Sequence, residues 1–437
     1  MKRFCAFFAL LLVIIMTFSG CAGVIVDTDS LLSPPRPEGE LYKISEVLEK
    51  STNEKFILKY PLSGEYRSAF VLKDINRDGT DEAFVFYSTT NESIVNMHIT
   101  LIKKQNGEWV FGGDFKCAAS GVETVEFHDM NNDGVEEILV GWSVYGTVDK
   151  SIGVYALSGG MFVQRATEKY TKFLCGDING DGEKELFLTH LDTVNKRSFA
   201  KIIKISSIGI AELGYCELDG LITEYKNPVI GKTADGESAV YIDAVKTQGA
   251  ITEVVVLGSD GVRNGRVIDP ENMVYTGREQ NVAIMDIDGD GVYEIPSLTV
   301  ITLGSGTADH VYRTDWYALG RSGIVPKVSA IMNYNDGYYI TIPEKWMDKI
   351  TVTRDTANRA RTISVIDSET GMSGSPLVTV SVIPRSENTT PQPALNQVEI
   401  TRTETMIYVA TIGNYEGAEA VTIEEFKTLF HLLGGKN

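Results

Sequence analysis

An acidic nine-residue pattern that occurs four times constrains this sequence more than any other feature. The copies begin at Asp74, Asp129, Asp177 and Asp286, and each carries carboxylate or amide side chains at positions 1, 3, 5 and 9. Position 6 is always glycine, which permits a sharp turn. Hard oxygen donors at this spacing are typical of a calcium-binding loop. We therefore expect about four structural Ca²⁺ ions, and the open alternative is a metal-free turn of acidic residues.

The expected ligands are the side chains at positions 1, 3, 5 and 9 and the backbone carbonyl of position 7. In chain order these positions hold Asp74, Asn76, Asp78, Thr80 and Glu82; Asp129, Asn131, Asp133, Val135 and Glu137; Asp177, Asn179, Asp181, Glu183 and Glu185; and Asp286, Asp288, Asp290, Val292 and Glu294.

The residues around the loops separate this pattern from an EF-hand. An EF-hand requires a bidentate glutamate at position 12, and that position here holds Val85, Val140, Leu188 and Ser297. Runs of β-branched and aromatic residues on both sides of the loops indicate strands. Each expected metal site therefore lies in a β-hairpin loop.

The spacing of the loops indicates a structural repeat. Successive copies start 55, 48 and 109 residues apart, and the last step spans two units. A fifth copy is therefore expected near residue 231, where the chain keeps Asp235, Gly236 and a following strand but lacks donors at positions 1 and 9. We expect this copy to be degenerate and metal-free. Units of about 55 residues match the period of a propeller blade.

At this point a family resemblance becomes visible. Loops of the form D-x-[DN]-x-D-G-x-x-[DE] followed by an apolar strand resemble the FG-GAP or VCBS repeats of integrin-α-type β-propellers. The resemblance covers residues 60–335. It implies a mainly β fold, a calcium-loop β-propeller of about five four-stranded blades, with the metal between the first and second strands of a blade.

The resemblance also implies where a ligand binds. In the family, ligand is carried by the loops that join strands two and three, on the face opposite the calcium loops. Here those loops are residues 88–96, 143–151, 191–198, 246–251 and 302–310. The candidate contacts within them are Tyr145, Asn195 and His310. The alternative is that these loops are plain solvated turns.

Strands and domains can be placed from the apolar pattern. In the second unit we expect strands at 122–128, 137–142, 152–157 and 161–165, and we assign residues 42–335 to the propeller. After residue 335 the metal pattern ends. Residues 336–437 are expected to form a small α+β C-terminal domain whose last helix is capped by Thr422.

The N-terminus has the features of an export signal. Residues 1–20 contain Lys2, Arg3 and an apolar run, and they precede Cys21. Residues 18–21 resemble the lipobox of bacterial lipoproteins, which implies lipid attachment at Cys21 and a location on the extracytoplasmic face of the bacterial cell membrane. Residues 21–41 are then a tether. Ordinary secretory cleavage and an uncleaved anchor stay open.

The net charge argues against one class of partner, and the cysteine positions indicate the state of the thiols. The formal net charge is −19 at pH 7, which argues against nucleic acid. Beyond Cys5 and Cys21, three cysteines occur at 117, 175 and 216. We expect buried thiols there, with one disulfide as the alternative.

Catalytic motifs are weak in this sequence. Ser373, in Gly-Met-Ser-Gly-Ser-Pro, resembles a peptidase nucleophile segment, but His310 lies only 63 residues before it and within the repeats. We therefore expect no enzyme. The favoured function is a cell-envelope lipoprotein whose calcium-stabilised propeller is a binding or scaffold module for an envelope protein or glycan. The alternative is an envelope hydrolase with the propeller as substrate platform and chemistry in the C-terminal domain.

Overall fold

The computed structural model describes residues 38–52, 54–91, 94–144, 150–206, 209–266, 276–279, 282–302, 310–367, 369–385 and 394–434. The expected signal peptide, Cys21 and Tyr145 lie outside these ranges. Within them, no helix is both long enough and apolar enough to span a membrane.

The described chain is mainly β, as expected, and consists of six antiparallel sheets. Sheet 1 holds β1 (Phe56–Leu58), β2 (Phe70–Lys73), β3 (Glu82–Asn91), β4 (Ile94–Gln105) and β5 (Glu108–Cys117). Sheet 2 holds β6 (Gly121–His128), β7 (Glu137–Ser143), β8 (Lys150–Ser158) and β9 (Met161–Tyr170). Sheet 3 holds β10 (Lys172–Gly176), β11 (Glu185–Asp192), β12 (Arg197–Ser206) and β13 (Gly209–Glu217).

The remaining sheets complete the repeats and the C-terminal part. Sheet 4 holds β14 (Ile222–Tyr225), β15 (Val229–Lys232), β16 (Ser238–Lys246), β17 (Ala250–Gly258), β18 (Gly261–Asn264) and β19 (Gly277–Arg278). Sheet 5 holds β20 (Ile295–Thr302), β21 (Val311–Gly320), β22 (Gly323–Asn333), β23 (Tyr338–Thr341) and β29 (Phe430–Leu432). Sheet 6 holds β24 (Ile350–Asp355), β25 (Ala360–Ile366), β26 (Ser373–Pro384), β27 (Val398–Arg402) and β28 (Met406–Ile412).

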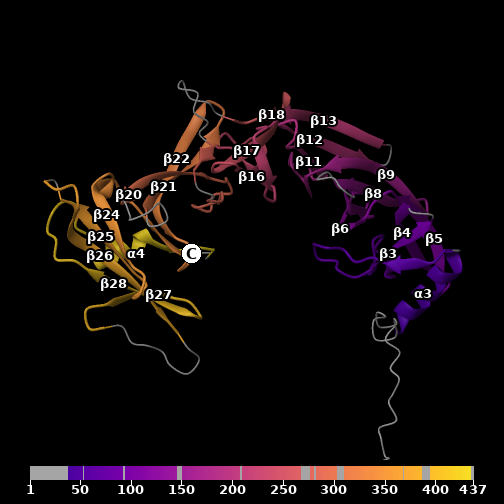
Figure 1. Cartoon of the computed structure of the whole chain (residues 1–437), viewed down its shortest axis with the longest axis horizontal. Helices are drawn as coiled ribbons and strands as arrows, with labels where there is room; N and C mark the ends of the chain where they lie inside the picture. The colour runs from indigo at the N-terminus through magenta and orange to yellow at the C-terminus, as the bar shows by residue number, and fades with distance from the viewer. Residues whose placement is uncertain are drawn as a thin grey trace, which may run out of the picture.

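The sheets follow one another along an open arc, with the first and last at its two ends (Figure 1). The strands expected in the second unit are confirmed as β6 to β9, within a few residues at their ends. Successive four-stranded sheets are thus present, whereas a closed ring is not seen in the described residues. A five-bladed propeller therefore remains a prediction.

Neighbouring sheets pack face to face through alternating apolar side chains. Phe86 of sheet 1 packs against Trp142 of sheet 2, and Leu139 of sheet 2 shares a buried cluster with Leu188 of sheet 3. Trp142 and Trp316 are 0% and 1% exposed, so both are part of the core. Cys117, Cys175 and Cys216 carry free thiols, of which Cys216 is buried and the other two are partly buried.

Helix α3 (Glu40–Ser51) covers the outer end of the arc. It buries Ile44 and Leu48 in a cluster with Val85 and Ile102 of sheet 1. The indole nitrogen of Trp109 donates to Glu40 at 2.6 Å, which fixes the start of the helix.

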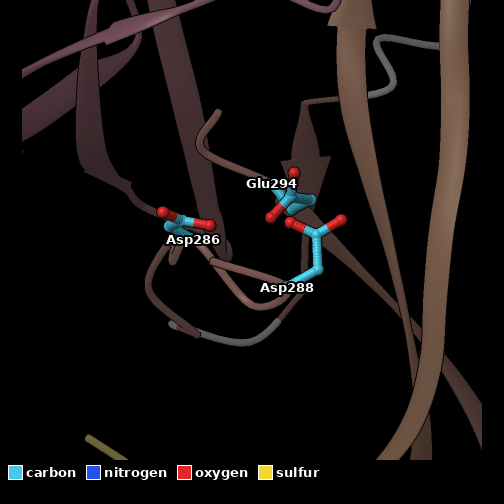
Figure 2. Close-up of side chains that lie close together, drawn as sticks. All are labelled: Asp286, Asp288 and Glu294. Atoms are coloured by element: carbon cyan, nitrogen blue, oxygen red, sulfur yellow. The ribbon is translucent and has the colours of Figure 1, made fainter. Parts of the chain in front are cut away.

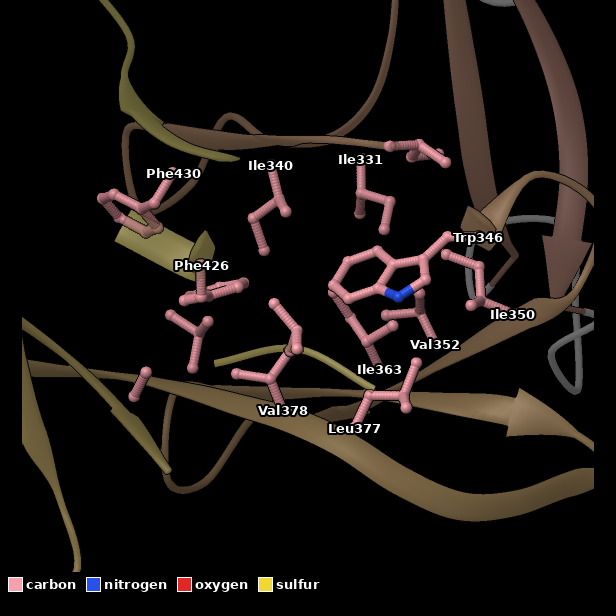
Figure 3. Packing of buried hydrophobic residues seen from close by; sticks show 14 of the residues in the cluster. Ile331, Ile340, Trp346, Ile350, Val352, Ile363, Leu377, Val378, Phe426 and Phe430 are labelled. Carbon is pink, nitrogen blue, oxygen red and sulfur yellow. The ribbon is translucent and has the colours of Figure 1, made fainter. Parts of the chain in front are cut away.

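The C-terminal part packs directly on the last repeat. Ile331 and Ile340 of sheet 5 lie in one buried core with Trp346 and with Val378 of sheet 6 (Figure 3). Strands β23 and β29 lie beyond residue 335 yet pair into sheet 5. Helix α4 (Ile423–Leu429) begins as expected, with the Thr422 hydroxyl accepting from the Glu425 amide at 3.2 Å.

Candidate metal loops and a surface groove

The four acidic loops adopt the same backbone. Position 6 is a glycine with φ between 84° and 89° in all four, a left-handed conformation that a side chain would strain. Position 4 is left-handed as well, even where Arg77 and Asn132 occupy it with φ of 57° and 56°. Because four separate segments share this geometry, the loop conformation is a structural repeat of the fold.

Hydrogen bonds inside each loop orient its oxygens. The amide of position 6 donates to the aspartate of position 1, at 2.9 Å from Gly79 to Asp74 and 3.0 Å from Gly291 to Asp286. The amide of position 7 donates in turn to the aspartate of position 5, as from Val292 to Asp290 at 2.8 Å. One oxygen of each carboxylate is therefore held by the backbone.

The glutamate at position 9 is buried in every loop. One oxygen of Glu294 accepts from the amide of Ile287 at 3.0 Å, and the side chain is fully buried. The other oxygen of Glu294 has no hydrogen-bond partner among the described residues, and the same holds for one oxygen each of Glu185 and Asp129. A buried carboxylate oxygen without a partner is costly unless a cation compensates it.

Burial also perturbs the acidity of these glutamates. Desolvation raises the pKa of Glu294 to about 7 and that of Glu82 to about 6, and the neighbouring aspartates add to both shifts. A group that resists ionisation in the protein alone is well suited to a site where a divalent cation supplies the missing positive charge.

The fourth loop brings three carboxylates together. Asp286, Asp288 and Glu294 each offer an oxygen, and these oxygens lie within 4.8 Å of one another. Figure 2 shows the carboxylates of Asp288 and Glu294 side by side, with that of Asp286 across from them. All three are hard oxygen donors, which is the set that Ca²⁺ prefers. The residues present therefore fit the expected ion, whose binding stays a prediction.

Lysines lie against the third and fourth loops. The Lys204 ammonium is 2.7 Å from Asp181 and 2.8 Å from Glu183, and Lys327 is 3.2 Å from Asp288 and also bonds Asp290. The hydrogen bond from Lys204 lowers the pKa of Asp181 to about 2. A lysine ammonium from a neighbouring strand therefore contacts the carboxylates of each of these two loops.

The degenerate fifth copy is a tight turn between β15 and β16. Arginines pair with its acidic side chains, since Arg263 and Arg321 each lie 2.5 Å from Glu237. Asp235 accepts a hydrogen bond from the Arg321 amide. This turn is therefore neutralised by arginine side chains.

A groove of about 830 Å³ lies on sheet 3, at the end of its strands that is opposite the acidic loop. The acidic loop joins β10 to β11 where Gly176 pairs with Glu185, whereas the β11–β12 hairpin turns at Asp192 and Arg197, at the other end of the same strands. The groove is lined by residues of this hairpin and of β13.

Aromatic rings line this groove. His190 and Phe199 are cross-strand partners whose rings stack at 4.3 Å and 13°. Tyr215 on β13 is 64% exposed and pairs with Lys201. Arg197 and Glu217 add charged groups to the lining. The groove therefore combines flat apolar surfaces with hydrogen-bonding groups.

Of the candidate ligand residues within the described ranges, Asn195 lies beside the groove and His310 lies in a different sheet region, before β21. Asn195 lies in the β11–β12 hairpin beside the groove, but its amide donates to Asp192 at 2.6 Å and holds the turn. The carbonyl of His310 accepts a hydrogen bond from Arg354 at 2.8 Å.

The serine of the peptidase-like segment, Ser373, begins β26. No histidine among the described residues is hydrogen-bonded to it. Sequence reasoning missed Phe199 and Tyr215, whose alternation with buried neighbours was the available signal.

No family model matches the sequence, and no curated protein matches it. Several solved structures that this chain resembles are enzymes that act on saccharides. Bacillus licheniformis rhamnogalacturonan lyase PL11 is 10% identical, with a TM-score of 0.30 over 71% of this chain and 74% of that one. The endo-arabinase of Bacteroides thetaiotaomicron VPI-5482 is 10% identical, with a TM-score of 0.23 over 64% and 99%. The Phanerochaete chrysosporium exo-beta-1,3-galactanase is 9% identical, with a TM-score of 0.25 over 75% and 80%.

These neighbours correct the expectation that the chain is not an enzyme. They process saccharides, so the exclusion of catalysis is withdrawn, although TM-scores of 0.30 or less assign no activity to this chain. The exclusion rested on missing local motifs. Carboxylates that act in catalysis need no local sequence motif, and Glu212 and Glu217 both line the groove.

Proposed function

We propose that this protein binds saccharide in the groove of sheet 3, on a scaffold that calcium stabilises through the acidic loops. The observation that carries the proposal is the pair of exposed aromatic side chains, Phe199 and Tyr215, that line the groove. Aromatic rings offer flat apolar faces to the C–H side of a sugar ring, while Arg197 and Glu217 offer partners to hydroxyl groups. The pattern at residues 18–21 motivates a location on the cell envelope.

The binding test uses calorimetry with a panel of neutral and acidic oligosaccharides. Tyr215→Ala is expected to weaken binding about fivefold or more, because an aromatic stacking contact contributes about 1 kcal/mol or more. Tyr60→Ala is the matched control, since Tyr60 is 50% exposed and lies outside the groove. Unchanged affinity in both Tyr215→Ala and Phe199→Ala would overturn the proposal.

The groove also supports a second candidate function, saccharide hydrolysis. Glu212 and Glu217 both line the groove, and carboxylic acids are the usual catalytic groups of glycosidases. Release of reducing ends from the oligosaccharides that bind tests this function. Glu217→Gln is expected to abolish turnover while binding persists, and equal turnover in the two proteins contradicts a role of Glu217.

Calcium is expected to act on stability. Removing it with a chelator should lower the melting temperature, because an ion that binds only the folded state stabilises by mass action, about 2.7 kcal/mol at a hundred times its Kd. Asp181→Ala should lose one bound ion, whereas Asp235→Ala, in the degenerate copy, should lose none. Equal ion counts in the two variants would show that the loops are misassigned.

A further inference from the structure

Two arginines lie directly opposite each other at the junction of sheets 5 and 6. Arg354 on β24 and Arg361 on β25 are cross-strand partners. Like charges at directly opposed positions destabilise a sheet. Their placement therefore needs a compensating partner, and an apolar or neutral residue at either position would suit the sheet better.

The partners of these guanidinium groups are backbone carbonyls of sheet 5 and its edge. Arg354 donates to the carbonyl of His310 at 2.8 Å, and Arg361 donates to that of Met332 at 2.7 Å. Within the described residues, no carboxylate lies within 4.0 Å of either group. Each guanidinium has five N–H donors, so most donors are left for another ligand.

The nearby acidic side chains are already engaged. Asp336 bonds Arg359, and Asp355 accepts from the amide and the side chain of Asn358 at 3.1 and 2.7 Å. Burial lowers the pKa of Arg361, and the charge of Arg354 adds to this effect. The pair is therefore a concentration of positive charge in a protein whose net charge is −19.

Both arginines face open space. Hollows of about 390 Å³ and 170 Å³ share Asn335, Arg354 and Arg361 in their linings. Tyr312 and Tyr334 line the smaller one, and Tyr334 is 52% exposed. A ligand in the smaller hollow would meet two guanidinium groups, an amide and aromatic rings, whereas the larger hollow is also lined by Asp336, Asp355 and Arg359.

We propose that this junction is a binding site for an oxyanion, the carboxylate or phosphate group of a ligand held between Arg354 and Arg361. The planar guanidinium fork matches both groups in geometry and charge. The site is distinct from the acidic loops and from the groove of sheet 3, and it does not depend on saccharide binding there.

Calorimetry with two probes tests the site in the full chain. The probes are inorganic phosphate and a galacturonate oligosaccharide, each at low and high salt. Binding of either probe supports the site if Arg354→Gln and Arg361→Gln each weaken it tenfold or more, and the probe that binds identifies the source of the oxyanion. Binding should also weaken with salt, because the contact is ionic.

Arg402→Gln is the matched control, because Arg402 carries the same charge on sheet 6 but is paired with Glu399 at 2.5 Å. This variant is expected to bind like the unmodified protein. A double variant of Arg354 and Arg361 that melts normally but still binds would overturn the proposal. So would the absence of binding of both probes to the unmodified protein, or an equal loss in Arg402→Gln.

Discussion

The backbone amide of Glu136 in the second acidic loop donates to the carbonyl of Ile75 in the first, with 2.8 Å between nitrogen and oxygen. The same bond recurs between Lys184 in the third loop and Met130 in the second, at 3.2 Å. The residue at position 2 also donates its own amide to the buried glutamate of its loop, as Met130 does to Glu137 at 2.9 Å. The first three loops therefore form a hydrogen-bonded row.

This row predicts that calcium binding at these loops is coupled. Asp129→Ala, in the middle loop, should lose one ion and also weaken binding at the first and third loops by severalfold, because their shared backbone loses its ordering. Asp286→Ala is the matched control, since it removes the same ligand position from a loop outside the row. Calcium titration calorimetry measures both. Equal affinities of the remaining sites in the two variants would contradict the coupling.

The raised pKa of Glu294 predicts a pH dependence for the calcium-free protein. Its pKa is about 7 in the folded state, compared with an ordinary value of 4.5, mainly because of burial. Between these values the folded state holds more protons than the unfolded state, so stability should fall as pH rises from about 5 to 7. The slope is measured by urea unfolding in chelator.

Glu294→Gln provides the control for this slope. Glutamine keeps an acceptor for the Ile287 amide but does not ionise, so the calcium-free variant should be more stable at pH 7 and depend less on pH. It should also bind one Ca²⁺ fewer. A slope as steep as that of the unmodified protein would assign the pH dependence to other groups.

The position of Lys204 predicts that removing this lysine raises the calcium affinity of the third loop. Lys204→Met removes a positive charge that lies 2.7 Å from Asp181, so calcium affinity at this loop should rise. A unit charge near the ion contributes about 1 kcal/mol in a solvated setting, which corresponds to roughly fivefold. Lys226→Met is the control, because that lysine pairs with Glu224 away from the loops. Lower affinity in Lys204→Met would show that the lysine positions the carboxylates for the ion.

A buried ion pair joins two strands of sheet 4, β16 and β19. Arg278 lies 2.6 Å from Asp243, with side chains 2% and 8% exposed. Arg278→Met leaves a buried carboxylate without its cation and should cost about 3–5 kcal/mol of unfolding free energy. The double variant with Asp243→Asn should recover part of this loss. Urea unfolding measures both, and a loss below about 1 kcal/mol would contradict this role for the pair.

The sequence alone determined the repeated local structure. The acidic loops, the strands β6 to β9 and the Thr422 cap follow from residues close in the chain, since turn geometry and strand alternation depend on neighbours. The degenerate copy near Asp235 was visible for the same reason. Local spacing also placed the buried glutamates at position 9, because that position opens the strand after the first three loops and directly precedes β20 after the fourth.

The tertiary structure decided how distant segments meet. The bond between Glu136 and Ile75, the ring pair of His190 and Phe199, and the opposed arginines 354 and 361 all depend on register between strands or on the packing of one sheet on the next. A shift of one residue in register would turn the two rings or the two arginines to opposite faces of their sheet. The open arc depends likewise on inter-sheet packing, which no local pattern encodes.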